Sequence, residues 1–282
     1  MRRQAGCARR APGYATNGGT GGGERGAVAH YARVDVSEHL AALRREGVLL
    51  AEAVGRLRLE TSVPTCPGWT VRDLLRHVGG IHRWAAMHVR EARARPVDGF
   101  REAVDAWPMD ADLLDWFRDG HARLLEALER APQDLRCWYF LEAPSPLAFW
   151  ARRQAHETAI HRADAESPTG CITAYDTAFA KDGLDELLLA FMARSDGRLT
   201  ADPPRSLHAH TTDTAGEWMV RIGPQTAEIT AEHAPADCTV SGAASDLYLL
   251  LWNRASTEHI HVQGDSKVLD LWRQSANIRW SD

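Results

Sequence analysis

The sequence predicts a four-helix bundle followed by a smaller α+β domain, and three observations lead to this prediction. Between residues 34 and 166, apolar residues recur at spacings of three and four, as in amphipathic helices. The turn-forming segment Ser167-Pro-Thr-Gly170 then interrupts the pattern. After Pro203-Pro204, apolar and polar residues alternate, which is typical of strands. We therefore expect a bundle over residues 34–167 and an α+β domain over residues 168–282.

Composition, charge and cysteine spacing restrict the class of protein to which this chain can belong. The 282 residues are 44% hydrophobic and 25% charged, as in globular proteins large enough for two domains. The net charge of −5 does not indicate a nucleic-acid-binding protein. No apolar run approaches the roughly 18–20 residues that a membrane-spanning helix needs. The N-terminal arginines precede no apolar segment, so we expect no secretory signal. The five cysteines are scattered without C-x-x-C pairs, which argues for a reducing cytoplasm and against a disulfide framework.

The N-terminal segment, residues 1–33, is rich in Arg and Gly and has almost no aliphatic side chains. Such a segment cannot bury enough apolar surface to offset its ordering entropy, so we predict that it is disordered. Its glycine run precedes no strand–helix unit, which makes a phosphate-binding loop a poor interpretation.

Capping signals indicate where the bundle helices begin. Ser37 is a suitable N-cap for a first helix that starts near Val34. Thr70 and Asp73 have the form of a capping box and open a second helix that runs to about Arg93. A third helix is expected over about 110–131, and a connector over about 133–146 leads into the fourth.

The fourth helix carries the strongest chemical signal. The stretch from Trp150 to Glu166 contains no Pro or Gly, and about 100° per residue places Glu157 and His161 on the face that Trp150 marks as inward. Arg162 and Glu166 fall on the opposite face. An inward carboxylate needs a cation or hydrogen-bond donors, and a divalent metal meets that need. The alternatives are a buried Glu–His ion pair and a solvated charged stripe.

The spacing excludes a zinc-protease helix, which has two histidines four residues apart. His156 and His161 are five apart, or about 140° around the helix. His77 lies at the edge of the apolar stripe of the second helix, and with Glu157 and His161 it would complete a three-ligand zinc site with an open fourth position. His82, His88 and His156 are competing ligands.

In the second part of the chain we expect one helix over about 177–194 and then an antiparallel meander of four short strands. The strands are marked by Leu207 to Thr211, Trp218 to Ile222, Ala227 to Ile229, and Cys238 to Val240. A buried helix over 244–254, a short strand at Ile260 and Val262, and a last helix capped by Ser266 complete the prediction.

Three motifs resemble those of the mycothiol-dependent maleylpyruvate isomerase family of actinobacteria. They are Val63-Pro-Thr-Cys-Pro-Gly-Trp-Thr-Val-Arg-Asp-Leu-Leu-Arg-His77, the stretch from His156-Glu157 through His161-Arg-Ala-Asp-Ala-Glu166, and Asp237-Cys-Thr-Val-Ser-Gly-Ala-Ala-Ser-Asp-Leu-Tyr-Leu-Leu-Leu-Trp-Asn-Arg254. The resemblance extends from about residue 35 to the end of the chain. It implies a DinB-like bundle, a C-terminal domain related to sterol-carrier folds, zinc held by His77, Glu157 and His161, and mycothiol as cosubstrate. It also implies an arginine that faces the metal, for which Arg254 is the best match.

The resemblance implies a metal-dependent enzyme acting on a small electrophilic molecule. In the namesake reaction, addition of a thiolate across the double bond of a cis-enedione acid allows rotation, and elimination of the thiol gives the trans isomer. Arg254 would hold a carboxylate of the substrate or the thiol. For Asp164, on the same helix, we favour a surface ion pair, with support of a metal ligand as the alternative.

Three other functions remain open. A mycothiol S-transferase would begin with the same chemistry but accumulate a thioether. A ligand-binding or regulatory protein would have a structural or degenerate metal site, although a structural zinc site usually has four protein ligands. A hydrolytic metalloenzyme would use metal-bound water. The sequence leaves the substrate, the identity of the metal and the oligomeric state undetermined.

Overall fold

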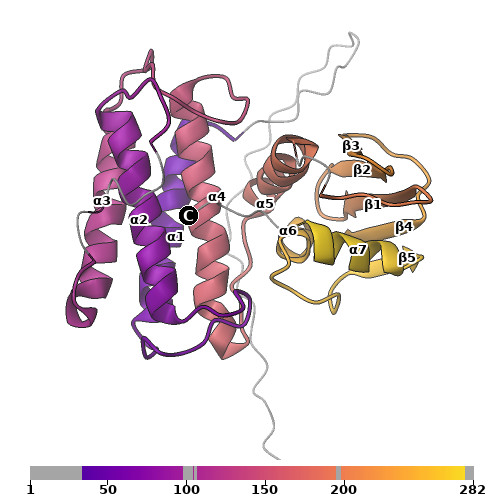
Figure 1. The fold of residues 1–282 in the computed structure, drawn as a ribbon, viewed down its shortest axis with the longest axis horizontal. Coiled ribbons are helices and arrows are strands. Elements are labelled where there is room, and N and C mark those ends of the chain that lie inside the picture. Colours follow the sequence, from indigo (N-terminus) through magenta and orange to yellow (C-terminus); the bar gives the residue numbers. More distant parts are fainter. Residues whose placement is uncertain (1–33, 98–103, 105–106, 195–197, 277–282) are drawn as a thin grey trace, which may run out of the picture.

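The computed structural model describes residues 34–97, 104, 107–194 and 198–276. Four helices stand side by side in its N-terminal part (Figure 1): α1 (Val36–Val54), α2 (Val71–Arg90), α3 (Leu113–Arg130) and α4 (Pro146–Glu166). The predicted bundle is therefore confirmed. The disorder predicted for residues 1–33 lies outside the described residues.

Local capping explains where three of these helices begin. Asp35, not Ser37, caps α1, because its carboxylate accepts from the backbone N–H of Glu38 at 2.9 Å and Glu38 reaches back in a capping box. The predicted box of Thr70 and Asp73 is present at the start of α2. Ser145 caps α4, so this helix begins one turn earlier than Trp150.

Helix α4 is buried on every side, which corrects the expectation of a single inward face. Arg162, on the face opposite the predicted site, has no exposed surface. Its guanidinium donates to Glu46 of α1 at 2.8 Å and lies 4.1 Å from the ring centre of Tyr175. The hydroxyl of Tyr175 in turn donates to the Ala159 carbonyl at 2.6 Å. The face that we expected to be outward is covered by α1 and by the chain that follows α4.

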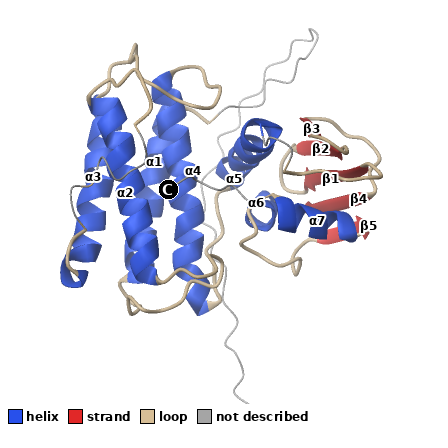
Figure 2. Cartoon of the chain, viewed as in Figure 1, coloured by secondary structure: helices blue, strands red, loops and turns tan. Residues whose placement is uncertain are grey.

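The C-terminal part combines helices with one five-stranded sheet (Figure 2). Helix α5 (Thr177–Asp185) continues as a π-helical segment η4 (Glu186–Phe191) and a short 3-10 turn η5 (Met192–Arg194), which confirms a helical segment over 177–194. The remaining helices and strands are β1 (Arg205–Thr211), β2 (Glu217–Ile222), β3 (Ala227–Thr230), β4 (Cys238–Gly242), α6 (Ala244–Leu251), β5 (His261–Gly264) and α7 (Lys267–Ser275).

The strand order β3-β2-β1-β4-β5 corrects the predicted meander. Strands β1, β2 and β3 are antiparallel neighbours, but β4 pairs in parallel with β1, with Leu207 opposite Cys238. The connection over residues 231–237 must therefore cross from the β3 edge past β2 and β1. Alternation reveals that a segment is a strand but carries no information about its partner.

The two faces of the sheet differ in composition. Leu207, Ala209, Trp218 and Val220 belong to the main cluster of buried apolar side chains, together with residues of α6 and α7. Because successive side chains of a strand point to opposite faces, the residues between them lie on the other face. These residues are mostly polar: Ser206, His208, His210, Glu217, Met219, Arg221, Thr239 and Ser241.

Several smaller expectations have definite outcomes. Ser266 precedes α7 but makes no side-chain capping bond, and Asp265 instead accepts from the Lys267 N–H at 3.1 Å. Cys66, Cys137 and Cys238 are free, whereas Cys171 is disulfide-bonded, which the cysteine spacing did not predict.

The boundary at residue 168 stays a prediction, since one cluster of buried apolar side chains extends from the bundle into the sheet. Among the described residues, no helix combines the length and apolar character needed to cross a bilayer.

Candidate metal centre

Helices α2 and α4 bring the three predicted ligands together. Oε1 of Glu157 lies 3.4 Å from Nε2 of His77 and 3.2 Å from Nε2 of His161. One ligand atom from each residue lies within 4.8 Å of the other two. The helical period explains the pair on α4, since residues four apart lie one above the other. The packing of α2 against α4 supplies the third side chain.

The spacing of these atoms fits a small divalent cation. Zinc lies about 2.0–2.2 Å from its nitrogen and oxygen ligands, so two ligands in a tetrahedral site are about 3.3–3.5 Å apart. The two separations from Glu157 Oε1, 3.4 and 3.2 Å, are close to that value. Two imidazoles and one carboxylate also form a donor set that suits zinc and similar metals. The residues therefore fit the metal that the resemblance implies.

An arginine that the sequence analysis missed supports Glu157 from its other side. Nη2 of Arg153 lies 3.2 Å from Oε2 of Glu157, and Nη1 of Arg153 pairs with Glu186. Burial alone would raise the pKa of Glu157, but hydrogen bonds from His161 and His77 and the charge of Arg153 hold that pKa well below its usual value. Glu157 is therefore ionised. Arg153 precedes Glu157 by four residues, so the helical period could have found it.

His161 is oriented by Asp164. The His161 Nδ1–H donates to Oδ2 of Asp164 at 2.8 Å, which directs Nε2 towards His77 and Glu157. Asp164 is fully buried and also accepts from the Thr65 hydroxyl at 2.6 Å, so the surface ion pair considered for it is wrong. Metal-ligating histidines usually donate their other ring N–H to a carboxylate in this way, which fixes the orientation of the ring. Burial raises the pKa of Asp164, but the charge of Arg254 and the bond from His161 outweigh that effect and lower it.

Arg254 reaches the same carboxylate from the C-terminal part of the chain. Its Nε lies 2.9 Å from Oδ1 of Asp164, and its Nη2 lies 3.1 Å from Oδ2. Nη1 donates to the Trp252 carbonyl at 2.8 Å, and Nη2 lies 3.7 Å from Sγ of Cys66. Asp164 thus binds the guanidinium bidentately. Through Asp164, which accepts from His161, the arginine is linked to the three predicted ligands.

The connector between α1 and α2 forms one side of the centre. The ring of Trp69 lies 4.9 Å from that of His77 and is stacked with that of His161 at 6.1 Å, centre to centre. The backbone N–H of Val63 donates to the Trp69 carbonyl at 2.9 Å, which closes the connector into a compact loop. The motif that carried part of the family resemblance therefore lines the site itself.

The competing histidines have other partners. Nε2 of His82 lies 2.9 Å from the Thr158 hydroxyl, and Nδ1 of His88 lies 2.9 Å from the Trp84 carbonyl. Neither residue belongs to a group of potential metal ligands among the described residues. His156 does, but in a separate group.

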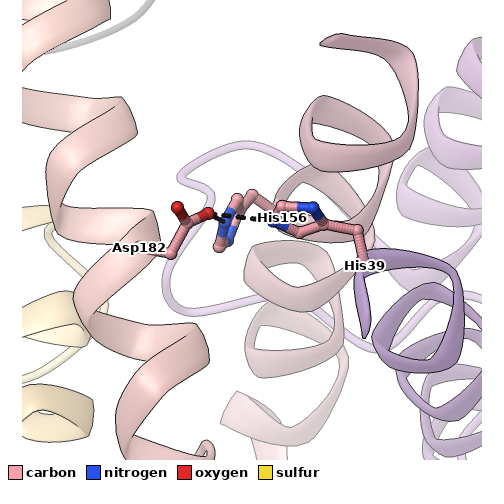
Figure 3. Close-up of side chains that lie close together, drawn as sticks. All are labelled: His39, His156 and Asp182. Atoms are coloured by element: carbon pink, nitrogen blue, oxygen red, sulfur yellow. Dashed lines mark hydrogen bonds and ion pairs between the residues drawn. The ribbon is translucent and has the colours of Figure 1, made fainter. Parts of the chain in front are cut away.

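That separate group joins α1, α4 and α5 (Figure 3). Nε2 of His156 and Nε2 of His39 lie 2.9 and 3.0 Å from the same oxygen, Oδ2 of Asp182, and their side chains point towards one another. Nε of Arg152 also donates to Oδ2, at 2.8 Å, and His156 Nδ1 lies 3.1 Å from the Tyr248 hydroxyl. The guanidinium already supplies the positive charge that a metal would bring. We therefore interpret this group as a structural joint between the bundle and the C-terminal part.

Replacing Asp182 with Asn should lower the free energy of unfolding by about 3–5 kcal/mol, because it leaves Arg152 largely buried without its counter-ion. The pKa of Asp182 is held well below its usual value, despite burial, by the bonds from His156 and His39. The wild-type chain should lose this contribution as the pH falls below about 4, and the variant should not. Denaturant unfolding at several pH values measures both effects. In the control Asp115→Asn, an ion pair between two exposed side chains, those of Asp115 and Arg118, is lost and the change should stay below about 1 kcal/mol. Equal changes in the two variants would contradict the structural role.

Comparison with known proteins places this site in a family. The model of the mycothiol maleylpyruvate isomerase N-terminal domain matches residues 19–166, and the model of the corresponding C-terminal domain matches residues 178–271. Two crystal structures of a mycothiol-dependent maleylpyruvate isomerase share the fold. The unsubstituted form is 14% identical with a TM-score of 0.54, a substituted form is 13% identical with a TM-score of 0.55, and each match covers 80% of this chain and 92% of the other. A search of curated proteins gave no match. The chain therefore belongs to the enzyme family of the mycothiol-dependent maleylpyruvate isomerases.

Proposed function

We propose that this chain is a metal-dependent enzyme that uses mycothiol and acts as an isomerase of the maleylpyruvate type. In this proposal His77, Glu157 and His161 hold a divalent metal, with zinc as the first choice. The observation that carries it is the spacing of their three ligand atoms, two of which lie 3.4 and 3.2 Å from the third. A metal bound there would stabilise the thiolate form of a thiol at its open position.

The residues around the three ligands prepare them for this role. Asp164 accepts from the Nδ1–H of His161, so Nε2 faces the metal position, where a bound metal would take the place of its proton. Arg153 keeps Glu157 ionised without occupying Oε1, the oxygen that lies between the two histidines. Trp69 covers the imidazoles of His77 and His161 with an apolar ring. Ligand orientation, ligand charge and local solvent exclusion are therefore set by separate side chains.

For Arg254 we propose a positioning role through Asp164. A carboxylate of the substrate or of mycothiol would have to compete with Asp164 for the Nε and Nη2 edge of the guanidinium. The carboxylate-binding role predicted from the sequence thus remains a separate hypothesis, and the two roles differ in their consequences for protein stability.

The proposal can be tested with the purified full-length chain. After removal of metal with a chelator, we expect no isomerisation of a cis-enedione acid, and we expect activity to require both added zinc and mycothiol. Elemental analysis should show metal bound by the active protein, and product analysis should show the trans acid. Activity of the metal-free protein equal to that of the zinc-loaded protein would overturn the metal dependence. A thioether that accumulates in place of the isomer would identify an S-transferase instead.

A further inference from the structure

Two histidines and a glutamate converge on the polar face of the C-terminal sheet, away from the bundle centre. Nδ1 of His233 lies 3.0 Å from Oε2 of Glu217, and Nε2 of His208 lies 3.9 Å from the same oxygen. The rings of His208 and His233 are perpendicular, with their centres 5.0 Å apart. One ligand atom from each of the three residues lies within 4.8 Å of the others. This group shares no residue with the candidate metal centre.

His208 is the buried member of the group, and its Nε2 has no hydrogen-bond partner among the described residues. The residue is only 2% exposed, and Nε2 is a buried atom without a partner in the structure. An unsatisfied buried imidazole nitrogen is energetically unfavourable, and a bound ligand is one way to satisfy it. The nitrogen lies beside Glu217 and His233, where a cation would satisfy it.

The topology of the sheet explains how these three residues meet. His208 and Glu217 lie on the face of β1 and β2 opposite the apolar core, since His210 is the register partner of Glu217 and His208 is two residues away on the same strand. The connection from β3 to β4 crosses this face and brings His233 over them. Glu232 pairs with Arg221 of β2 and so anchors the connection next to His233. The three residues therefore meet because the connection from β3 to β4 passes over this face of the sheet.

The charges around this group differ from those around Asp182. At Asp182 the guanidinium of Arg152 occupies the carboxylate oxygen that the histidines share. Among the described residues, Glu217 has ion-pair contacts with His208 and His233 but none with an arginine or lysine. The carboxylate is thus left with imidazole partners and can offer its charge to a cation.

From this geometry we propose that His208, Glu217 and His233 form a second divalent-metal site, suited to zinc or a similar transition metal. Two imidazole nitrogens and one carboxylate oxygen are the donor set that such ions prefer, and water would complete the coordination. The bound ion would fix the β3–β4 connection to the sheet. Because this connection determines the position of β4 beside β1, the site would stabilise the C-terminal part of the enzyme without taking part in its chemistry.

The test is the zinc content of the full-length chain after equilibration with micromolar zinc and removal of unbound metal. We expect two equivalents in the wild type and one in His233→Ala. The His233 side chain is 73% exposed, so this change should not impair folding. The matched control His261→Ala, at an exposed position of β5 in the same sheet, should retain two. Zinc should also raise the melting temperature of the wild type more than that of His233→Ala.

Combined variants separate this inference from the proposed function. If both sites exist, His161→Ala retains one equivalent and His161→Ala with His233→Ala retains none. One equivalent that is lost with His233→Ala but not with His161→Ala would support the sheet site and overturn the bundle site. Zinc content and melting temperature that are the same in His233→Ala and in the wild type would overturn the sheet site. His208→Ala, which removes the buried ligand, should give the same zinc content as His233→Ala.

Discussion

Replacing His161 with Ala should release the metal from the bundle centre and abolish thiol-dependent isomerisation. His161 is held in place by a buried carboxylate, since its Nδ1–H donates to Asp164 at 2.8 Å. Loss of such a supporting group typically weakens metal binding about 10–100-fold, and loss of the ligand itself should have a larger effect. Zinc affinity, measured by competition with a chromophoric chelator, and isomerase activity should fall together.

His88→Gln is the matched control for this experiment. Periodicity alone cannot exclude His88 as a ligand, but its Nδ1 lies 2.9 Å from the Trp84 carbonyl, and the residue is absent from the ligand group. Glutamine can replace the lost donor, so zinc affinity should remain within a few-fold of the wild type. A variant of His88 that lost metal while His161→Ala kept it would show that the centre has been assigned to the wrong side chains.

Replacing Arg254 with Ala should lower the free energy of unfolding by about 3–5 kcal/mol and weaken metal binding. Asp164 is fully buried, so removing its bidentate partner leaves an uncompensated charge in the protein interior. The same carboxylate orients His161, and its altered protonation or position would disturb that ligand. Denaturant unfolding of the metal-free protein isolates the loss of stability, and metal competition measures the second effect.

A double variant distinguishes the two roles of Arg254. If the arginine acts through Asp164, removing both partners in Arg254→Ala with Asp164→Ala should restore most of the lost stability, because no buried charge remains. If the arginine instead serves to hold a substrate or thiol carboxylate, Arg254→Ala should raise KM while stability and zinc affinity stay unchanged. The latter result would overturn the positioning role.

Much of the bundle was predictable because its determinants are local. The helical period placed Glu157 and His161 on one face, and the box of Thr70 and Asp73 marked the start of α2. The N-cap of α1 was misplaced by two residues, since Ser37 and Asp35 are both good caps and only backbone geometry selects between them. The same period could not reveal that Arg162 is buried, because its burial depends on Tyr175 and on the chain beyond the bundle.

The sequence by itself determined which residue types were available for the metal centre and which of them share a helix face, since these depend on the period of a single helix. The sequence also favoured His77 as the third ligand, but only tertiary structure separated it from the competing His88. Tertiary structure alone decided that Arg254 is bound by Asp164 and that β4 lies parallel to β1 with His233 over His208. The physical reason is that long-range pairings depend on how separate helices and strands pack. A local period specifies which face a side chain occupies, but not what that face will meet.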